Sequence, residues 1–402
     1  MNKQYLNYFL NDIIKIYPEA LDVLSMLGFE SFVKNNNYEA ISPFIKLKTI
    51  LKTGSINDNT FLSLLEEKIS SSGCNSPFEY TLEVRDKLNM LALLPCPLKL
   101  PLQEAFLQCV NNDIVKSCNY LIEGNANNQY SYYDYVEQFD DIDEIPDIVI
   151  TPGINSFYYK KFVDKFIKKG LFAYVAEPVP NCTFSEAGIL DPEGSYNILY
   201  MNLLVMVVDK LKIGNTPIPK AWGDLLNPDF KNKIAIRGQN TTFCETTLLT
   251  IFKEYGFEGI RRLGRSVKYG WHPAQMAKAA GSGSKDSPTV SIMPYFYTKT
   301  IKHKQNVEVI WPKDGAIVSP VTMLVKAEKA KSLKNISSFF TSSYAGRICA
   351  SACFPSLHPE VDNRISKDVK FNWLGWDFIK QYDVGSLLSQ LNKVFANEFL
   401  KD

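Results

Sequence analysis

The sequence has few of the residues, and none of the short motifs, on which many enzymes depend. Only three of its 402 residues are histidine, so general acid–base chemistry has few carriers. The phosphate-binding loop G-x-x-x-x-G-K-[ST], the nucleophile elbow G-x-S-x-G and the zinc motif H-E-x-x-H are all absent, as is a G-x-G-x-x-G after a strand. We therefore expect a protein that is not an enzyme.

Charge of one sign and long apolar runs are also lacking. The 44 basic and 43 acidic residues leave a formal net charge of +1, and without a basic patch we expect no nucleic-acid partner. The longest apolar run, Leu203 to Val208, is too short to span a bilayer, so no membrane insertion is expected. The first residues lack the secretory-signal pattern. As written, the sequence predicts a soluble, cytoplasmic protein, or an extracytoplasmic one if a signal has been removed.

The eight cysteines form no C-x-x-C pair. Their spacing matches neither a zinc site nor a small disulfide scaffold. Cys349 and Cys353 share a face if residues 345–352 are helical. A metal or redox pair is one interpretation of this spacing, and two small buried thiols is the favoured one.

The chain is long enough for two or three domains. In residues 1–72 apolar side chains recur every three or four positions, which predicts an all-helical module with helices at 5–16, 18–26, 41–51 and 58–69. Residues 73–79 have the composition of a linker.

After the linker, short apolar runs alternate with helical patterns. This alternation predicts open α/β sheets with ligands at the carboxyl ends of the strands. The predicted strands lie at 90–94, 120–123, 148–150, 234–236 and 289–293. The predicted helices between them lie at 102–110, 132–139, 157–169 and 242–255.

The most informative stretch runs from Ala221 to Gly256. Trp222 anchors a turn, residues 234–236 read as a buried strand, and a polar loop follows. Glu245 stands three residues after Thr242, where a capping box wants it, so we expect a helix to begin there. A strand that feeds a helix through such a loop points free backbone N–H groups at a ligand.

This stretch, W-x-D-L-L-x-P-x-F-K-x-K-I-A-I, resembles a segment of type II periplasmic solute-binding proteins, in particular the iron(III)-type branch that serves ABC transporters. Three further segments agree in order along the chain: D-I-V-I at 147–150, W-P-K-D-G-A at 311–316 and S-P-V-T-M-L-V-K at 319–326. The resemblance covers roughly residues 80–402.

The resemblance implies an α/β fold of two lobes, with the all-helical module added before it. Lobe one would comprise residues 80–200 and 314–402, and lobe two residues 201–313, with hinge closure on a ligand between them. Residues 14–29 resemble a small helical domain of unknown function that is often attached to redox and hybrid-cluster proteins. We expect it to pack or to bind a partner.

In lobe one, two segments that follow strands are candidates for ligand binding. Pro95 to Lys99 reads as a turn that directs Cys96 or Lys99 into a cleft, or as a rigid surface turn. Gly153, Asn155 and Ser156 follow the strand at 148–150, where Asn155 or Ser156 caps the next helix, contacts the ligand, or does both.

In lobe two, the loop residues Asn240, Thr241 and Thr242 offer amides and hydroxyls suited to an oxyanion, with simple capping as the alternative. His272 and Gln275 flank a helix start at Pro273, where they bind a ligand or merely pack.

By the resemblance, Tyr295 and Tyr297 stand where iron-binding relatives carry two adjacent tyrosines, but Phe296 separates them here. Phenolates suit Fe(III), so Tyr295, Tyr297 and His272 are the candidate metal ligands, for Fe(III) bound with an anion. Asp314 lies where the chain returns between the lobes and predicts a hinge turn or a ligand contact.

The favoured hypothesis is a non-enzymatic protein that closes two lobes on a small polar or anionic solute or a metal ion, for delivery to an ABC permease. The alternative is a cytosolic ligand sensor or metallochaperone that binds a protein partner through residues 1–72. A second alternative is a small-molecule enzyme on the same fold, using Cys96, His272 and Tyr295.

Overall fold

The computed structural model describes residues 3–71, 89–110, 118–124, 132–176, 182–239, 242–366 and 368–400. Its contacts divide the chain into two compact units. The first unit contains Met1–Ile150, Lys161–Phe172 and Val325–Lys331; the second contains Thr151–Lys160, Ala173–Leu324 and Ser332–Asp402.

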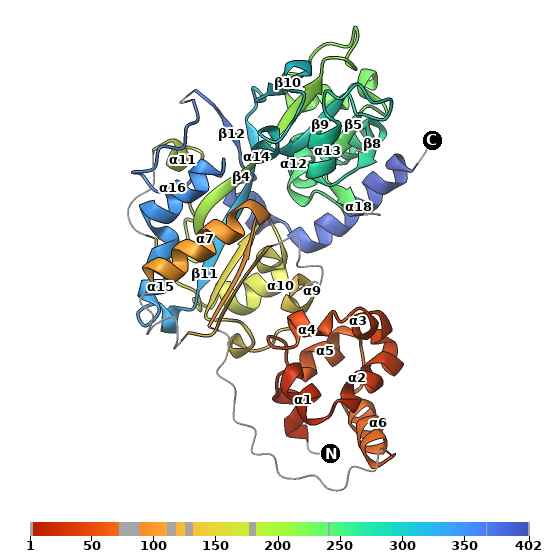
Figure 1. Ribbon diagram of the computed structural model, residues 1–402, viewed down its shortest axis with the longest axis vertical. Coiled ribbons are helices and arrows are strands. Elements are labelled where there is room, and N and C mark those ends of the chain that lie inside the picture. The colour runs from red at the N-terminus through yellow and green to blue at the C-terminus, as the bar shows by residue number, and fades with distance from the viewer. Residues whose placement is uncertain are drawn as a thin grey trace. The chain divides into compact units, whose positions relative to one another are not determined.

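The start of the first unit is all helical, as predicted, although the helices are shorter and more numerous than expected (Figure 1). A buried core of Leu10, Ile13, Leu24, Ile50 and Phe61 holds them together. The elements are η1 (Lys3–Asn7), α1 (Leu10–Ile16), α2 (Glu19–Leu24), η2 (Ser25–Phe29), α3 (Glu30–Lys34), α4 (Tyr38–Ile41), α5 (Leu47–Thr53) and α6 (Asp58–Ser71).

The first unit also contains the strands β1 (Met90–Leu94) and β2 (Tyr120–Gly124) and the first three residues of β3 (Ile148–Pro152). β1 pairs in parallel with both of the others, which confirms the three predicted strands. The turn predicted at 95–99 is wrong, because α7 (Cys96–Cys109) begins there. Pro97 stands in the first turn of this helix, where its missing N–H leaves no hydrogen bond unmade.

The sheet of the second unit is organised around the long strand β4 (Asn197–Asp209). One edge of β4 pairs antiparallel with β11 (Ala316–Val325) and then with β10 (Val307–Ile310), and the other edge pairs antiparallel with β9 (Val290–Pro294). Beyond β9 lie β5 (Ile234–Ile236) and β8 (Val267–Gly270), both parallel to β9. The short strand β12 (Phe371–Asn372) pairs with β11.

A small antiparallel ladder, β6 (Gly238–Gln239) with β7 (Thr242–Phe243), follows β5. It corrects the predicted capping box: Thr242 lies in β7, and α12 begins only at Glu245. The helix predicted at 157–169 is also wrong as one element, because it consists of η5 (Ser156–Tyr158), α10 (Lys160–Phe162) and η6 (Val163–Ile167).

The remaining helical elements cover the sheets and complete the chain. They are α9 (Tyr132–Val136), η4 (Ile142–Glu144), α11 (Cys182–Glu186), η7 (Trp222–Leu226), η8 (Pro228–Phe230), α12 (Glu245–Ser266), α13 (Pro273–Ala279), α14 (Tyr295–Thr298), η9 (Lys304–Asn306), η10 (Ala327–Lys329), α15 (Lys334–Thr341), α16 (Ser343–Ser351), α17 (Trp376–Gln381) and α18 (Val384–Phe399).

Candidate functional site

Four strands of the second unit end at the same edge of its sheet. β5, β8 and β9 are mutually parallel, and β10 shares their direction because β9 and β10 both run antiparallel to β4. Open α/β sheets bind ligands at the carboxyl ends of such strands. The residues that stand at this edge are Arg237, His272, Tyr295, Tyr297, Lys299 and Trp311, which we call the strand-end cluster.

His272 caps α13, as the predicted helix start at Pro273 requires. The His272 Nδ1 accepts the Ala274 backbone N–H at 3.2 Å, and the His272 backbone N–H donates to Gln275 Oε1 at 3.0 Å. Partial burial and the nearby Arg237 charge lower the pKa of His272. The imidazole is therefore neutral at pH 7 and, because Nδ1 is an acceptor, carries its hydrogen on Nε2. Both His272 and Gln275 are engaged in capping.

The two tyrosines of α14 have different surroundings. Tyr295 Oη accepts a hydrogen bond from Lys299 Nζ at 2.9 Å, and its ring meets Trp311 edge-on at 5.7 Å. Tyr297 packs against a buried apolar cluster and lies 6.1 Å from the His272 ring. The intervening Phe296 is 5.0 Å from the Tyr297 ring. The structure thus brings His272 and Tyr297 together, with Tyr295 on the Trp311 side.

Arg237 is a cluster residue that sequence reasoning missed. It follows β5 directly and forms an ion pair with Glu245. The Glu245 carboxylate raises the pKa of Arg237 still further, so this side chain is always a cation. The sequence signal that would have found Arg237 is its place immediately after the predicted strand at 234–236.

The loop residues Asn240 and Thr241 lie outside the described residues, and Thr242 is exposed on β7. The adjoining Phe243 is firmly anchored. Its N–H donates to Asn392 Oδ1 at 3.0 Å and its ring lies 4.3 Å from Phe395, both on α18. A Cβ on Gly238 would lie 2.5 Å from this ring, so the glycine leaves the space that the ring fills.

Asp314 belongs to the turn between β10 and β11. Its Oδ2 accepts the Trp222 N–H at 2.9 Å, and the Trp222 indole N–H donates to Gly315 O at 2.8 Å. Burial raises the pKa of Asp314. Of the two interpretations from sequence, the turn is what this geometry supports.

Gly153, Asn155 and Ser156 form a loop that is hydrogen-bonded to itself and to β11. Gly153 N–H donates to Pro320 O at 2.7 Å. Asn155 Oδ1 accepts the Phe157 N–H at 3.1 Å and its Nδ2 donates to Thr151 Oγ1 at 3.2 Å. Ser156 is 2% exposed. Asn155 is thus the predicted cap, and a ligand contact by this loop stays a prediction.

In the first unit, Cys96 is exposed at the start of α7, and Lys99 is paired rather than available as a lone cation. Lys99 Nζ lies 2.6 Å from Glu123 Oε1, which also accepts the Gly124 N–H at 2.7 Å. Sequence reasoning missed Glu123, although it stands at the carboxyl end of a predicted strand.

The described part of the chain contains no group of three or more His, Cys, Asp and Glu side chains that could hold a metal ion. The face expected to be shared by Cys349 and Cys353 is wrong, because α16 ends at Ser351 and Cys353 follows it with φ +64°. Cys349 is fully buried on α16 and Cys353 is half-buried, and burial raises the pKa of the Cys349 thiol. The expectation of a buried thiol holds for Cys349.

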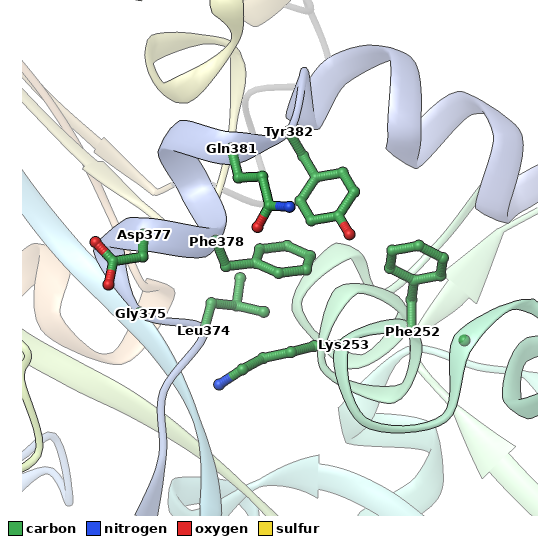
Figure 2. A pocket seen from close by; sticks show the side chains of 9 residues that line it. Phe252, Lys253, Leu374, Gly375, Asp377, Phe378, Gln381 and Tyr382 are labelled. Carbon is green, nitrogen blue, oxygen red and sulfur yellow. The ribbon is translucent and has the colours of Figure 1, made fainter.

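A pocket of about 610 Å³ lies between α12 and α17 in the second unit (Figure 2). The Phe252, Phe378 and Tyr382 rings line it together with Lys253 and Asp377. None of the residues predicted from sequence to bind a ligand lies in its wall.

With this geometry in view, the sequence matches the family model described as bacterial extracellular solute-binding protein over residues 143–382, more than half of the chain. The chain belongs to this family. No curated protein matches it. In the described residues of this solute-binding protein, no helix is both long and apolar enough to cross a membrane.

Solved structures show the same fold at low sequence identity. Apo ferric ion-binding protein A of Pasteurella haemolytica is 14% identical, with a TM-score of 0.53 over 78% of this chain and 98% of that one. A Trichodesmium protein in complex with iron and citrate is 15% identical, with a TM-score of 0.54 over 78% and 99%. AfuA of Actinobacillus pleuropneumoniae, with fructose 6-phosphate bound, is 15% identical, with a TM-score of 0.52 over 78% and 98%. The predicted two-lobed solute-binding fold is confirmed.

Proposed function

We propose that this solute-binding protein binds one small polar solute at the strand-end cluster, without chemical conversion, and delivers it to an ABC permease. The observation that carries the proposal is the meeting of four strand ends, each followed by polar or aromatic side chains. The candidate solutes are an anion or a metal ion bound with an anion. The titles of solved relatives name a ferric ion, iron with citrate, and fructose 6-phosphate.

Closure about a hinge is part of this proposal. The predicted lobe boundaries fall inside β4, at residues 200 and 201, and just before β11, at 313 and 314. β4 and β11 pair along most of their lengths, so two adjacent strands would connect the lobes. Rotation at two such crossings is a hinge motion of the kind that closes binding proteins on a ligand.

Native mass spectrometry of freshly purified protein, combined with elemental analysis, tests the proposal. We expect a co-purified solute in stoichiometric amount, recovered chemically unchanged after denaturation. Repeated conversion of added solute into a product by the protein would contradict the non-enzymatic proposal. A protein that retains no solute, and whose melting temperature responds to no anion or metal ion, would contradict solute binding at this site.

A second candidate function is that of a cytosolic sensor whose helical module binds a protein partner. The observation that favours it is a built contact within the first unit between α5 and residues 138–144. Thr49 Oγ1 donates to the buried Glu144 Oε2 at 2.7 Å, and Lys48 Nζ lies 3.3 Å from Glu144 Oε1. Lys52 and Lys165 both pair with Asp140.

Through this contact, the module would respond to movement of the strands that follow residue 147. Fractionation of native cells separates the two functions. A cytoplasmic pool that co-purifies with a protein through residues 1–72 supports the sensor, and an extracytoplasmic pool supports transport.

A further inference from the structure

The polar atoms of the strand-end cluster are mainly hydrogen-bond donors. Arg237 and Lys299 are cations that offer only N–H groups. His272 presents Nε2–H, since its Nδ1 lone pair accepts the Ala274 N–H at 3.2 Å. Tyr295 Oη accepts from Lys299 at 2.9 Å, which leaves its own O–H to donate elsewhere. A partner for these groups must therefore be rich in acceptors.

The positive charges of the cluster also favour an anionic partner. Lys299 Nζ lies 4.4 Å from the centroid of the Tyr295 ring, and the Arg237 charge reaches His272. The Glu245 carboxylate beside the cluster is already engaged, because it pairs with Arg237. An incoming anion would supply the countercharge that Lys299 lacks within the described contacts of this cluster.

A ferric ion needs the opposite arrangement. It is held by anionic oxygen ligands and by free nitrogen lone pairs. At this edge the imidazole lone pair is used in capping, Lys299 stands beside the Tyr295 ring, and Arg237, although paired with Glu245, acts on His272. Cations next to a trivalent ion oppose its binding through direct charge repulsion.

We infer that the solute is a metal-free oxyanion attached to a carbon skeleton, either a phosphate ester or a polycarboxylate. Lys299 and Arg237 bind its anionic oxygens, and the half-buried Tyr295 and Trp311 rings, which contact each other edge-on at 5.7 Å, together pack against one side of its carbon part. This inference rests on the proposed function and names the chemical class of its solute.

Calorimetry with four probes tests it: fructose 6-phosphate, fructose, metal-free citrate and ferric citrate. We expect binding of at least one metal-free anion and none of fructose. Lys299→Met should weaken that binding by at least tenfold. Lys302→Met, which removes the same charge from an exposed neighbouring position, should change it by less than twofold.

The two metal-free anions distinguish a phosphate ester from a polycarboxylate. Binding of ferric citrate alone, with a visible tyrosinate–iron absorption band, overturns the inference but leaves solute binding intact. Failure of both metal-free anions to bind also overturns it. Equal losses in the Lys299 and Lys302 variants would show that general charge, rather than this cluster, attracts the anion.

Discussion

Replacement of Gly315 by alanine tests whether the turn between β10 and β11 depends on a close backbone approach. Gly315 has φ +97°, a conformation that L-residues rarely adopt. A Cβ at this position would lie 2.7 Å from both Asn372 N and Phe371 C. These are backbone atoms of β12, which pairs with β11 at Ala316 and Ile317. Neither atom can move without disturbing that pairing.

The expected loss is the sum of three terms. The left-handed conformation costs an alanine about 1–2 kcal/mol, and reduced freedom of the unfolded chain returns about 0.4–1 kcal/mol. The contact with β12 resembles overpacking, which costs about 1–3 kcal/mol. Together these terms predict a decrease of about 1–5 kcal/mol in the free energy of unfolding.

Gly214→Ala is the matched control, because Gly214 has φ +55° and a Cβ there would meet no atom within 4 Å. Its predicted loss is at most about 1.5 kcal/mol, from conformation alone. Urea denaturation followed by tryptophan fluorescence measures both variants. Equal losses would refute the close-approach argument, and a larger loss in Gly214→Ala would reverse it.

Three further variants test individual contacts. Thr49→Val should lower the free energy of unfolding by about 1.5–3 kcal/mol, since it removes a hydrogen bond to a buried carboxylate. Thr53→Val should cost less, because the Thr53 hydroxyl donates only to Thr49 O among the described contacts. Differential scanning calorimetry of the two variants measures both losses. The Lys165 and Lys52 ammonium groups lower the pKa of Asp140 to about 2. Its stabilisation is therefore present above pH 4 and lost as the pH falls toward 2. Because Asp140 is 55% exposed, we expect Asp140→Asn to lose only about 0.5–1 kcal/mol at pH 6 and clearly less at pH 2, where the Asp140 carboxyl is about half protonated in the folded protein, by denaturant titration at both. Asn392→Leu should accelerate hydrogen exchange at the Phe243 amide, while Asn392→Asp keeps the acceptor and should leave exchange slow; similar rates in the two variants would contradict anchoring by Asn392.

The strands and the family were predictable from sequence because their signals are local. A short apolar run between polar residues predicts a buried strand such as 234–236, and the Trp222 segment has a distinctive order of residues. Pro95 to Lys99 was misjudged as a turn because proline suits both a turn and the first turn of a helix, and only the packing of α7 decides between them.

Other errors arose from contacts between residues far apart in the chain. Thr242 and Glu245 have the spacing of a capping box, but Phe243 is held in β7 by Asn392 and Phe395, about 150 residues later. The pairing of Lys99 with Glu123 and of Arg237 with Glu245 likewise depends on the folded chain. A search restricted to local motifs cannot find such pairs, since charged residues at these spacings are common on any surface.

The turn between β10 and β11 and the strand-end cluster share one short segment. β10 ends at Ile310, and Trp311, the next residue, belongs to the strand-end cluster. Four residues later, at the start of β11, the Gly315 carbonyl oxygen accepts the Trp222 indole N–H. The motif that resembles the family, W-P-K-D-G-A, therefore holds the turn through Asp314 and Gly315, whereas the solute is proposed to contact other side chains, such as Lys299 and Tyr295. Turn geometry and solute chemistry thus depend on different residues. A chain can keep the first while the second changes, so a resemblance in the turn segment indicates the fold and does not decide the solute.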